Sequence, residues 1–205
     1  MTPDGRVVMT LKHGKHTYNE LRLETGLSDR WLTVKLKELV SEGVVEKSGR
    51  WYGLTGKPAV SAYELALYMR TQAKRMASEL ADLRFIRAIV LFGSVARKKA
   101  HEYSDLDMMI IVDEPVDKAR KEVASEISIL ESKYHMTVEP LILSGGDFVE
   151  NIQSEEGGII YGLAEGFEVL FDRTGETAET LSERVEEVKQ GHDYLEEVRI
   201  WLKAK

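Results

Sequence analysis

The fold of this chain is decided by Leu91-Phe92-Gly93-Ser94-Val95-Ala96-Arg97 and by Ser104-Asp105-Leu106-Asp107, which follows after a short polar loop. The apolar run that leads into the first stretch from Ile86 predicts a buried strand, and the apolar run that ends at Val112 predicts a second one. A strand that enters Gly-Ser and continues into residues that favour a helix can hold phosphate. Glycine lets the backbone approach closely, while the serine hydroxyl and nearby N–H groups donate to phosphate oxygens.

Two aspartates follow the Gly-Ser pair at a spacing that suits a metal ion. Asp105 and Asp107 are two residues apart, so in a strand both carboxylates project from the same face. Hard oxygen ligands of this kind suit Mg²⁺ or Mn²⁺, which keep waters and share the phosphates of a substrate. Together the two motifs indicate phosphoryl or nucleotidyl transfer. Taken singly, Gly-Ser is more typical of a plain turn, and the aspartates of a strand end that faces water.

A third carboxylate is predicted on a neighbouring strand. Glu139 is the one acidic residue in the otherwise β-prone run from Thr137 to Leu143. A carboxylate inside an apolar strand is costly unless it has a partner such as a shared metal ion. The alternative is an edge-strand residue that faces water, and the adjacent Pro140 favours that alternative.

Gly-Ser, a spacer, Asp-x-Asp and a later strand carboxylate resemble the nucleotidyltransferase superfamily that includes DNA polymerase beta. The short form of residues 85–172 is most similar to the minimal nucleotidyltransferases. The resemblance implies a nucleotide site in which Ser94 and the backbone of Gly93 hold the triphosphate. It also implies that Arg97, about one turn into the helix after Ser94, reaches a phosphate.

The resemblance implies a metal-dependent reaction as well. Asp105 and Asp107 would bind the Mg²⁺ (or Mn²⁺) ions, and Glu139 would complete the site that activates an attacking hydroxyl. The reaction implied is transfer of NMP from an NTP, with ATP as the expected donor, to a hydroxyl acceptor with release of pyrophosphate. The acceptor is a protein, a nucleic acid or a small molecule, and some relatives are antitoxins that adenylylate a partner toxin. Relatives often carry glycine after the arginine, where this chain has Lys98, and commonly aspartate at the position of Glu139.

The first part of the chain predicts a separate small module. Its hydrophobic spacing gives three helices, the third from Asp29 to Ser41, and a hairpin around Ser48-Gly49. This order resembles a winged helix-turn-helix, in which the third helix enters the major groove and the hairpin touches the DNA backbone. The residues that this resemblance would place on DNA are Arg30, Thr33, Lys35, Lys37, Lys47 and Arg50. The alternatives are that these side chains are solvated, or that the module binds a protein.

The predicted fold class is α/β (α+β), with a small mixed sheet and a winged-helix-like module. The expected organisation is a module at 1–58, a connecting helix at 59–84, a nucleotidyltransferase domain at 85–172 and a C-terminal helical segment at 173–205. The connecting helix and the charged tail from Thr177, also predicted to be helical, are candidate surfaces of a homodimer, and both are equally typical of core elements.

Composition narrows the class of protein. The chain has no cysteine, which excludes a disulfide framework, a thiolate zinc site and a cysteine nucleophile. No apolar run approaches the roughly 20 residues that cross a bilayer, and no secretion signal is evident, so we expect a cytoplasmic protein.

The charge of the chain is unevenly distributed. Residues 1–58 carry ten Lys/Arg and seven Asp/Glu, whereas the remaining residues carry 18 Lys/Arg and 28 Asp/Glu. The net charge of the whole chain is −7. A mildly basic head on an acidic body suits a nucleic-acid-binding module joined to another domain. The competing hypothesis is a DNA-binding regulator that senses nucleotide without turning it over.

Overall fold

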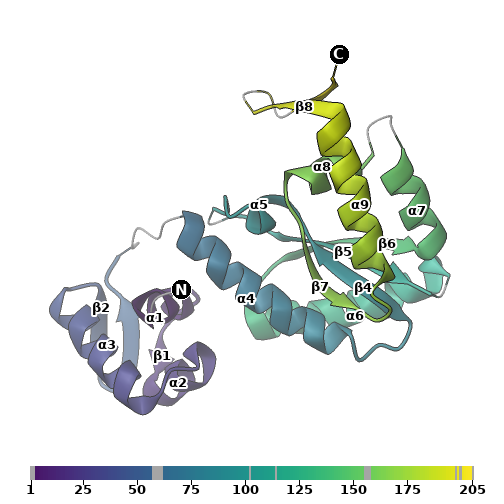
Figure 1. Ribbon diagram of the computed structural model, residues 1–205. Helices are drawn as coiled ribbons and strands as arrows, with labels where there is room; N and C mark the ends of the chain where they lie inside the picture. Colours follow the sequence, from purple (N-terminus) through teal and green to yellow (C-terminus); the bar gives the residue numbers. More distant parts are fainter. Residues whose placement is uncertain are drawn as a thin grey trace. The chain divides into compact units, whose positions relative to one another are not determined.

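The computed structural model describes residues 3–56, 62–101, 103–113, 115–154, 158–196, 198 and 200–204. The chain forms two compact units, Met1–Tyr68 and Met69–Lys205 (Figure 1). Their boundary falls inside helix α4 (Ala62–Leu80). The module boundary predicted at residue 58 lies outside the described residues.

The first unit is a helical module with a small antiparallel sheet. Its strands have the order β1-β3-β2, and strand β1 was not predicted. Its elements are α1 (Pro3–Leu11), β1 (His16–Thr17), α2 (Tyr18–Thr25), α3 (Asp29–Ser41), β2 (Val45–Ser48) and β3 (Trp51–Leu54). The core consists of Val7, Val8, Leu11, Leu21, Leu32, Leu36, Leu39 and Val45.

Local sequence explains where the helices of this unit begin and end. Thr17 and Glu20 form a capping box at the start of α2, and Gly26 ends that helix at φ +63°. Ser28 accepts a hydrogen bond from the N–H of Trp31 and so caps α3. These caps fix the short connection between the two helices.

The second unit confirms the predicted mixed α/β fold. From Met69 it contains the rest of α4, followed by further helices and strands. These are β4 (Ile86–Leu91), α5 (Gly93–Ala96), β5 (Leu106–Val112), α6 (Val116–Tyr134), β6 (Val138–Ser144), α7 (Gly145–Gln153), α8 (Ile160–Glu165), β7 (Glu168–Asp172), α9 (Glu176–Gly191), β8 (His192–Leu195) and β9 (Ile200–Lys203). None of the described helices is long and apolar enough to span a membrane.

The central sheet has the strand order β6-β5-β4-β7. Strands β5 and β6 are parallel and are joined through α6, whereas β4 runs antiparallel to both β5 and β7. Alternate residues such as Val90 and Met109 pack against α7, α8 and α9 on one face. Helices α4 and α6 lie together on the other side (Figure 1), where Lys133 donates to Glu79. The sheet is therefore covered on both faces and open at its ends.

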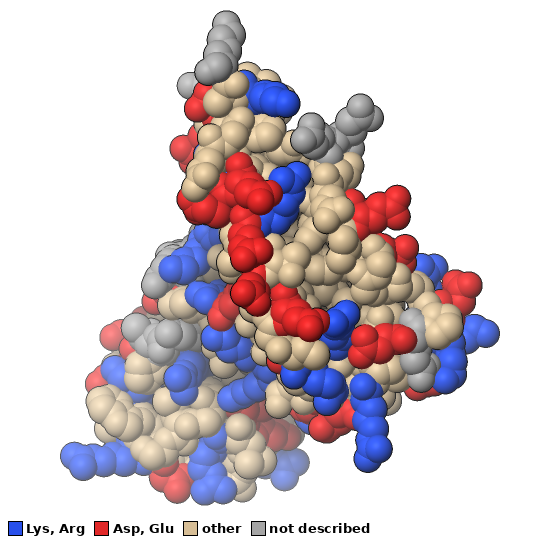
Figure 2. Space-filling model, turned by 45° about the vertical axis from the view of Figure 1, so that its right-hand side comes forward, with Lys and Arg blue, Asp and Glu red and all other residues tan. Residues whose placement is uncertain are grey.

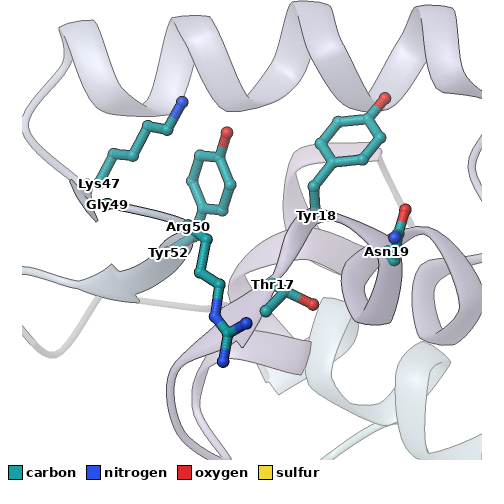
Figure 3. Close-up of a pocket in the computed structure, with 7 residues that line it drawn as sticks. All are labelled: Thr17, Tyr18, Asn19, Lys47, Gly49, Arg50 and Tyr52. Atoms are coloured by element: carbon teal, nitrogen blue, oxygen red, sulfur yellow. The ribbon is translucent and has the colours of Figure 1, made fainter.

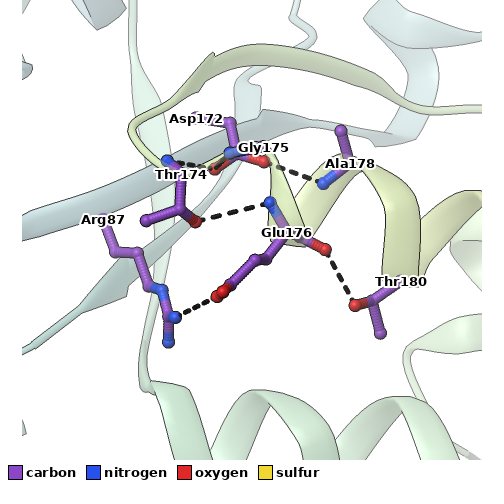
Figure 4. Close-up of polar contacts among 7 residues, drawn as sticks. All are labelled: Arg87, Asp172, Thr174, Gly175, Glu176, Ala178 and Thr180. Carbon is purple, nitrogen blue, oxygen red and sulfur yellow. Dashed lines mark hydrogen bonds and ion pairs between the residues drawn. The ribbon is translucent and has the colours of Figure 1, made fainter.

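The loop between β7 and α9 is held by a compact polar network (Figure 4). The Asp172 carboxylate accepts hydrogen bonds from the backbone N–H groups of Thr174, Gly175 and Ala178. Arg87 of β4 forms an ion pair with Glu176 in the first turn of α9. A carboxylate at a helix N-terminus is favourable, so this network fixes where α9 leaves the sheet.

The prediction of a helical segment from Thr177 to Lys205 is wrong beyond Gly191, where α9 ends and two strands follow. Strands β8 and β9 pair antiparallel, with Tyr194 opposite Trp201. The centroids of these two rings lie 4.9 Å apart. Trp201 Nε1 donates to the carbonyl of Tyr161 in α8 at 3.0 Å. Contacts between residues distant in the sequence therefore outweigh the near-helical spacing of the apolar residues.

Candidate active site

The carboxylate of Asp107 lies directly against the backbone of Gly93. Gly93 has φ +70°, and a Cβ built there would lie 1.7 Å from Asp107 Oδ2. The N–H of Phe92 donates to the Asp107 carbonyl at 3.0 Å, and the backbone N–H of Ser94 acts to lower the pKa of the Asp107 carboxylate. The sequence predicted that this glycine allows close approach to a phosphate, and the structure shows close approach to one of the predicted metal ligands.

Ser104 joins the two predicted motifs and was missed as a site residue. The Ser94 hydroxyl donates to Ser104 Oγ at 3.1 Å, and the N–H of His101 donates to the same oxygen at 3.0 Å. The N–H of Lys99 donates to the Ser94 carbonyl at 2.9 Å. The loop between α5 and β5 is thus folded back onto Ser94. The position of Ser104 immediately before Asp105 was the available clue.

Asp107 and Glu139 are neighbours across the parallel strands β5 and β6. They are Cα partners in the register, so their side chains project from the same face of the sheet. Asp105 is exposed just before β5, two residues from Asp107. Glu139 is also exposed, and β6 is an edge strand that tolerates Pro140. Glu139 therefore faces water on an edge strand, as the alternative prediction had it, and it also lies beside Asp107.

The electrostatics of this end of the sheet centre on Asp107. Its pKa is raised, first by burial and then by the negative charge of Glu139, with a further contribution from Asp105. Arg97 acts in the opposite direction. Three carboxylates with one nearby arginine form a site that favours a cation.

The donor set fits Mg²⁺ in its chemistry. Among the described residues, no group of three or more acidic, histidine or cysteine side chains is placed so that it could hold a metal ion. Mg²⁺ is usually bound through one or two carboxylates, with waters and substrate phosphates completing its ligands. The adjacent pair Asp107 and Glu139, with Asp105 beside it, matches that pattern of partial protein ligation.

Arg97 is held in place by contacts with the end of α8 and with the glycine that follows it. Its guanidinium Nη1 lies 3.7 Å from Glu165 Oε2 at the end of α8, and both side chains are largely buried. A Cβ at Gly166 would lie 3.2 Å from Arg97 Cγ, so the arginine stem packs against this glycine. The sequence predicted Arg97 but gave no indication of Glu165, because the contact joins segments distant along the chain.

A second ionic cluster anchors α4 at the same end of the sheet. Arg70 Nε donates to Glu168 Oε2 at 2.7 Å, and Lys74 Nζ lies 2.8 Å from Glu168 Oε1. Burial acts to raise the pKa of Glu168, but hydrogen bonds from Lys74 and Arg70 outweigh it and lower the pKa. Glu168 pairs with Leu91 in the register, on the face opposite Asp107. The cluster therefore supports the end of β4 from which Gly93 emerges.

The residues of α3 that the sequence proposed for DNA binding differ in how available their side chains are. Arg30, Thr33 and Lys37 are exposed on α3. Lys35 is instead engaged within the unit, 2.6 Å from Glu38 and 3.4 Å from Asp4, and its pKa is raised, chiefly by the hydrogen bond to Glu38. Lys35 is therefore less available to a phosphate than the sequence suggested.

Lys47 and Arg50 line a groove of about 400 Å³ between the hairpin and the start of α2 (Figure 3). Lys47 Nζ lies 5.4 Å from the centroid of the Tyr52 ring, and the Arg50 guanidinium lies 5.1 Å from that of Trp51. The remaining walls are Thr17, Tyr18, Asn19 and Gly49. The groove thus combines cationic and aromatic side chains.

Comparisons with known proteins identify the class of enzyme. The family model of the nucleotidyltransferase domain matches residues 70–172. The chain therefore belongs to the nucleotidyltransferase domain family, and it is a nucleotidyltransferase. A search of curated protein sequences found no match.

Two solved structures illustrate the similarity. One is a toxin-antitoxin with AMP-PNP, at 15% identity and a TM-score of 0.39, with 58% of this chain and 86% of that chain covered. Another is the tri-AMPylated Shewanella oneidensis HEPN toxin in complex with MNT antitoxin, at 15% identity and a TM-score of 0.37, with 60% and 87% covered. At these scores the assignment rests on the family match.

Proposed function

We propose that the second unit transfers AMP from ATP to a hydroxyl acceptor in a Mg²⁺-dependent reaction that releases pyrophosphate. The observation that supports this most directly is the position of the Asp107 carboxylate over the Gly93 backbone, with Glu139 beside it in the register. This arrangement brings the predicted phosphate-binding turn and the predicted metal ligands to one end of the sheet.

In this proposal each side chain has a separate role. Ser94 and the backbone around Gly93 bind the triphosphate, and Arg97, oriented by Glu165, neutralises phosphate charge. Asp107 and Glu139, with Asp105 beside them, would hold Mg²⁺, which would supply charge stabilisation for the entering and leaving oxygens at the α-phosphorus.

Glu139 also accepts the proton of the attacking hydroxyl. The acceptor oxygen forms a bond to the α-phosphorus while the bond to the bridging oxygen of pyrophosphate breaks. The exposure of Glu139 leaves room for an acceptor beside it. This step assigns to Glu139 both a ligand role and a proton-accepting role.

The acceptor is a protein, a nucleic acid or a small molecule. We further propose that the first unit is a winged helix that brings DNA or a macromolecular partner to the enzyme. The cationic groove with Lys47 and Arg50 supports this role, because phosphates are attracted by such side chains.

The binding half of the proposal is tested by calorimetric titration of ATP in Mg²⁺ and in EDTA. Wild type should bind ATP more tightly with Mg²⁺, and Asp107→Ala should lose that difference. The matched control is Glu122→Ala, which removes an exposed carboxylate from α6 away from the site. Equal Mg²⁺ dependence in Asp107→Ala and Glu122→Ala would refute the site.

A further inference from the structure

The strands β8 and β9 present one face that carries aliphatic side chains to solvent. In the register Leu195 pairs with Ile200, and Asp193 pairs with Leu202. Because side chains alternate along a strand, these four lie on the face opposite the Tyr194 and Trp201 pair. Tyr194 and Trp201 are partly buried, and Trp201 bonds to α8, so the aliphatic face is the outer one.

This outer face is an apolar patch. Leu195 is 45% exposed, Ile200 and Leu202 are each 49% exposed, and Val198 between the strands is 59% exposed. Single exposed aliphatic residues are common on protein surfaces, but a contiguous group on one face is typical of an interaction site. Within the described chain, β8 and β9 pair with each other and with no further strand.

The helix that leads into this patch is strongly acidic. Helix α9 ends at Gly191, where β8 begins, and Figure 2 shows acidic side chains gathered in a stripe along it. Its exposed acidic residues are Glu176, Glu179, Glu183, Glu186 and Glu187. Residues 59–205 as a whole carry 28 acidic and 18 basic side chains. The same face of a second copy would bring like charge against like charge, whereas a cationic partner would be attracted.

The patch is fixed to the body of the unit beside the active site. Trp201 is hydrogen-bonded to Tyr161, whose ring also contacts His192 edge-on at 5.4 Å. Glu196 lies 3.4 Å from Lys99, in the loop that folds back onto Ser94. A protein docked on this patch would therefore be near the nucleotide site.

We propose that the outer face of β8 and β9, with the acidic face of α9, is a docking surface for a basic amphipathic helix of a partner protein. A sheet face that is apolar on one side is normally completed by a helix packed against it. Leucine-type side chains of the partner cover Leu195, Ile200 and Leu202, and its lysines or arginines face Glu183 and Glu186. This surface is a feature of the chain that the transfer chemistry does not require.

The proposal is tested with a fluorescent 16-residue amphipathic helix that has leucine on one face and lysine on the other. Two comparison peptides replace lysine by glutamate or scramble the order so that no apolar face exists. Binding is measured by anisotropy on the full chain without nucleotide, so its outcome is independent of the proposed transfer reaction. We expect saturable binding of the lysine peptide alone, weakened by increasing salt.

Variants locate the site of binding. Leu195→Ser with Ile200→Ser should weaken the lysine peptide at least tenfold, and Glu183→Gln with Glu186→Gln should weaken it several-fold. The matched control is Ile129→Ser, which changes a residue 58% exposed on α6 and should bind as wild type does. Circular dichroism and melting curves check folding, and the single change Leu202→Ser provides a milder test of the same face.

Three results would overturn the proposal. The first is no saturable binding of the lysine peptide, and the second is equal binding by wild type and by the Leu195→Ser, Ile200→Ser variant. The third is a wild-type dimer in light scattering that becomes a monomer in that variant, since the patch would then belong to a second copy of the chain.

Discussion

Replacing Gly93 with alanine should damage the enzyme in two separable ways. The backbone at Gly93 has φ +70°, a left-handed conformation that costs a residue with a Cβ about 1–2 kcal/mol. In addition, the new Cβ would lie 1.7 Å from Asp107 Oδ2 and 2.5 Å from its Cγ, whereas real Cβ contacts essentially never fall below 3.0 Å. The carboxylate, which is a predicted metal ligand, must therefore move.

The size of the effect follows from that displacement. The Asp107 carboxylate has to shift by roughly 1 Å or more, and a misplacement of about 1 Å typically costs about 100-fold in rate. We expect Gly93→Ala to lose at least that factor in α-phosphate labelling of an acceptor, together with the Mg²⁺ dependence of ATP binding.

Gly175→Ala is the matched control for backbone strain. Gly175 has φ +83° in the same unit, but nothing lies within 4 Å of a Cβ built there. Both variants should melt earlier, since about 1 kcal/mol shifts Tm by about 2–4 °C in a chain of this size, and Gly93→Ala should melt earlier still because Asp107 must also be displaced. Only Gly93→Ala should lose labelling. If Gly93→Ala labels as well as Gly175→Ala does, the geometry of the site is wrong.

Three further predictions concern titration, nucleotide binding and nucleic-acid binding. Because the pKa of Asp107 is raised in the folded chain, its ionisation lowers the stability of the fold as pH rises above the ordinary pKa of 3.8. Asp107→Asn should therefore raise Tm at pH 8 without Mg²⁺ but not near pH 4. A lower Tm for this variant at pH 8 would contradict the prediction. Glu165→Gln should raise the KM for ATP several-fold with kcat less affected, because Arg97 loses its partner; a fall in kcat alone would contradict an orienting role. Lys47→Ala should weaken the binding of duplex DNA and reduce the slope of log K against log salt by about 0.9, whereas Lys35→Ala should change neither quantity. Equal effects of Lys47→Ala and Lys35→Ala in anisotropy titrations would refute the role of the groove.

The elements with strong local signals were predictable from the sequence. Helix α3 spans Asp29–Ser41, the range that its hydrophobic spacing predicted. Helix α6 spans Val116–Tyr134, and its buried residues Ala119, Val123, Ile127 and Leu130 recur at helical spacing. The buried strands β4 and β5 were evident because both are apolar runs, interrupted only by Arg87 and by Asp107. In these segments the local pattern and the tertiary packing favour the same structure.

Elements that depend on distant contacts were not predictable in this way. Strand β1 has two residues and exists through its pairing with β3. The segment beyond Gly191 has apolar residues at near-helical spacing, yet it forms strands because Trp201 packs against Tyr194 and bonds to α8. Neither contact leaves a periodic pattern in a single sequence.

The residues of the candidate site also differ in how far the sequence predicted them. The motif residues Gly93 and Asp107 were evident from type and spacing, and the register then brought Glu139 beside Asp107. Glu165 and Ser104, which contact Arg97 and Ser94, act through contacts that the fold creates. Glu165 has no distinctive neighbours in the sequence, whereas Ser104 lies immediately before Asp105, which was the one available clue.

The central claim is tested most directly by labelling a host-cell lysate with ATP that carries ³²P at the α or the γ position. Wild type and Asp107→Ala are compared, each with Mg²⁺ and with EDTA. The proposed reaction predicts label on an acceptor from the α position alone, from wild type alone, and only with Mg²⁺. Label from the γ position, or equal α-label with Asp107→Ala, would contradict nucleotidyl transfer at this site.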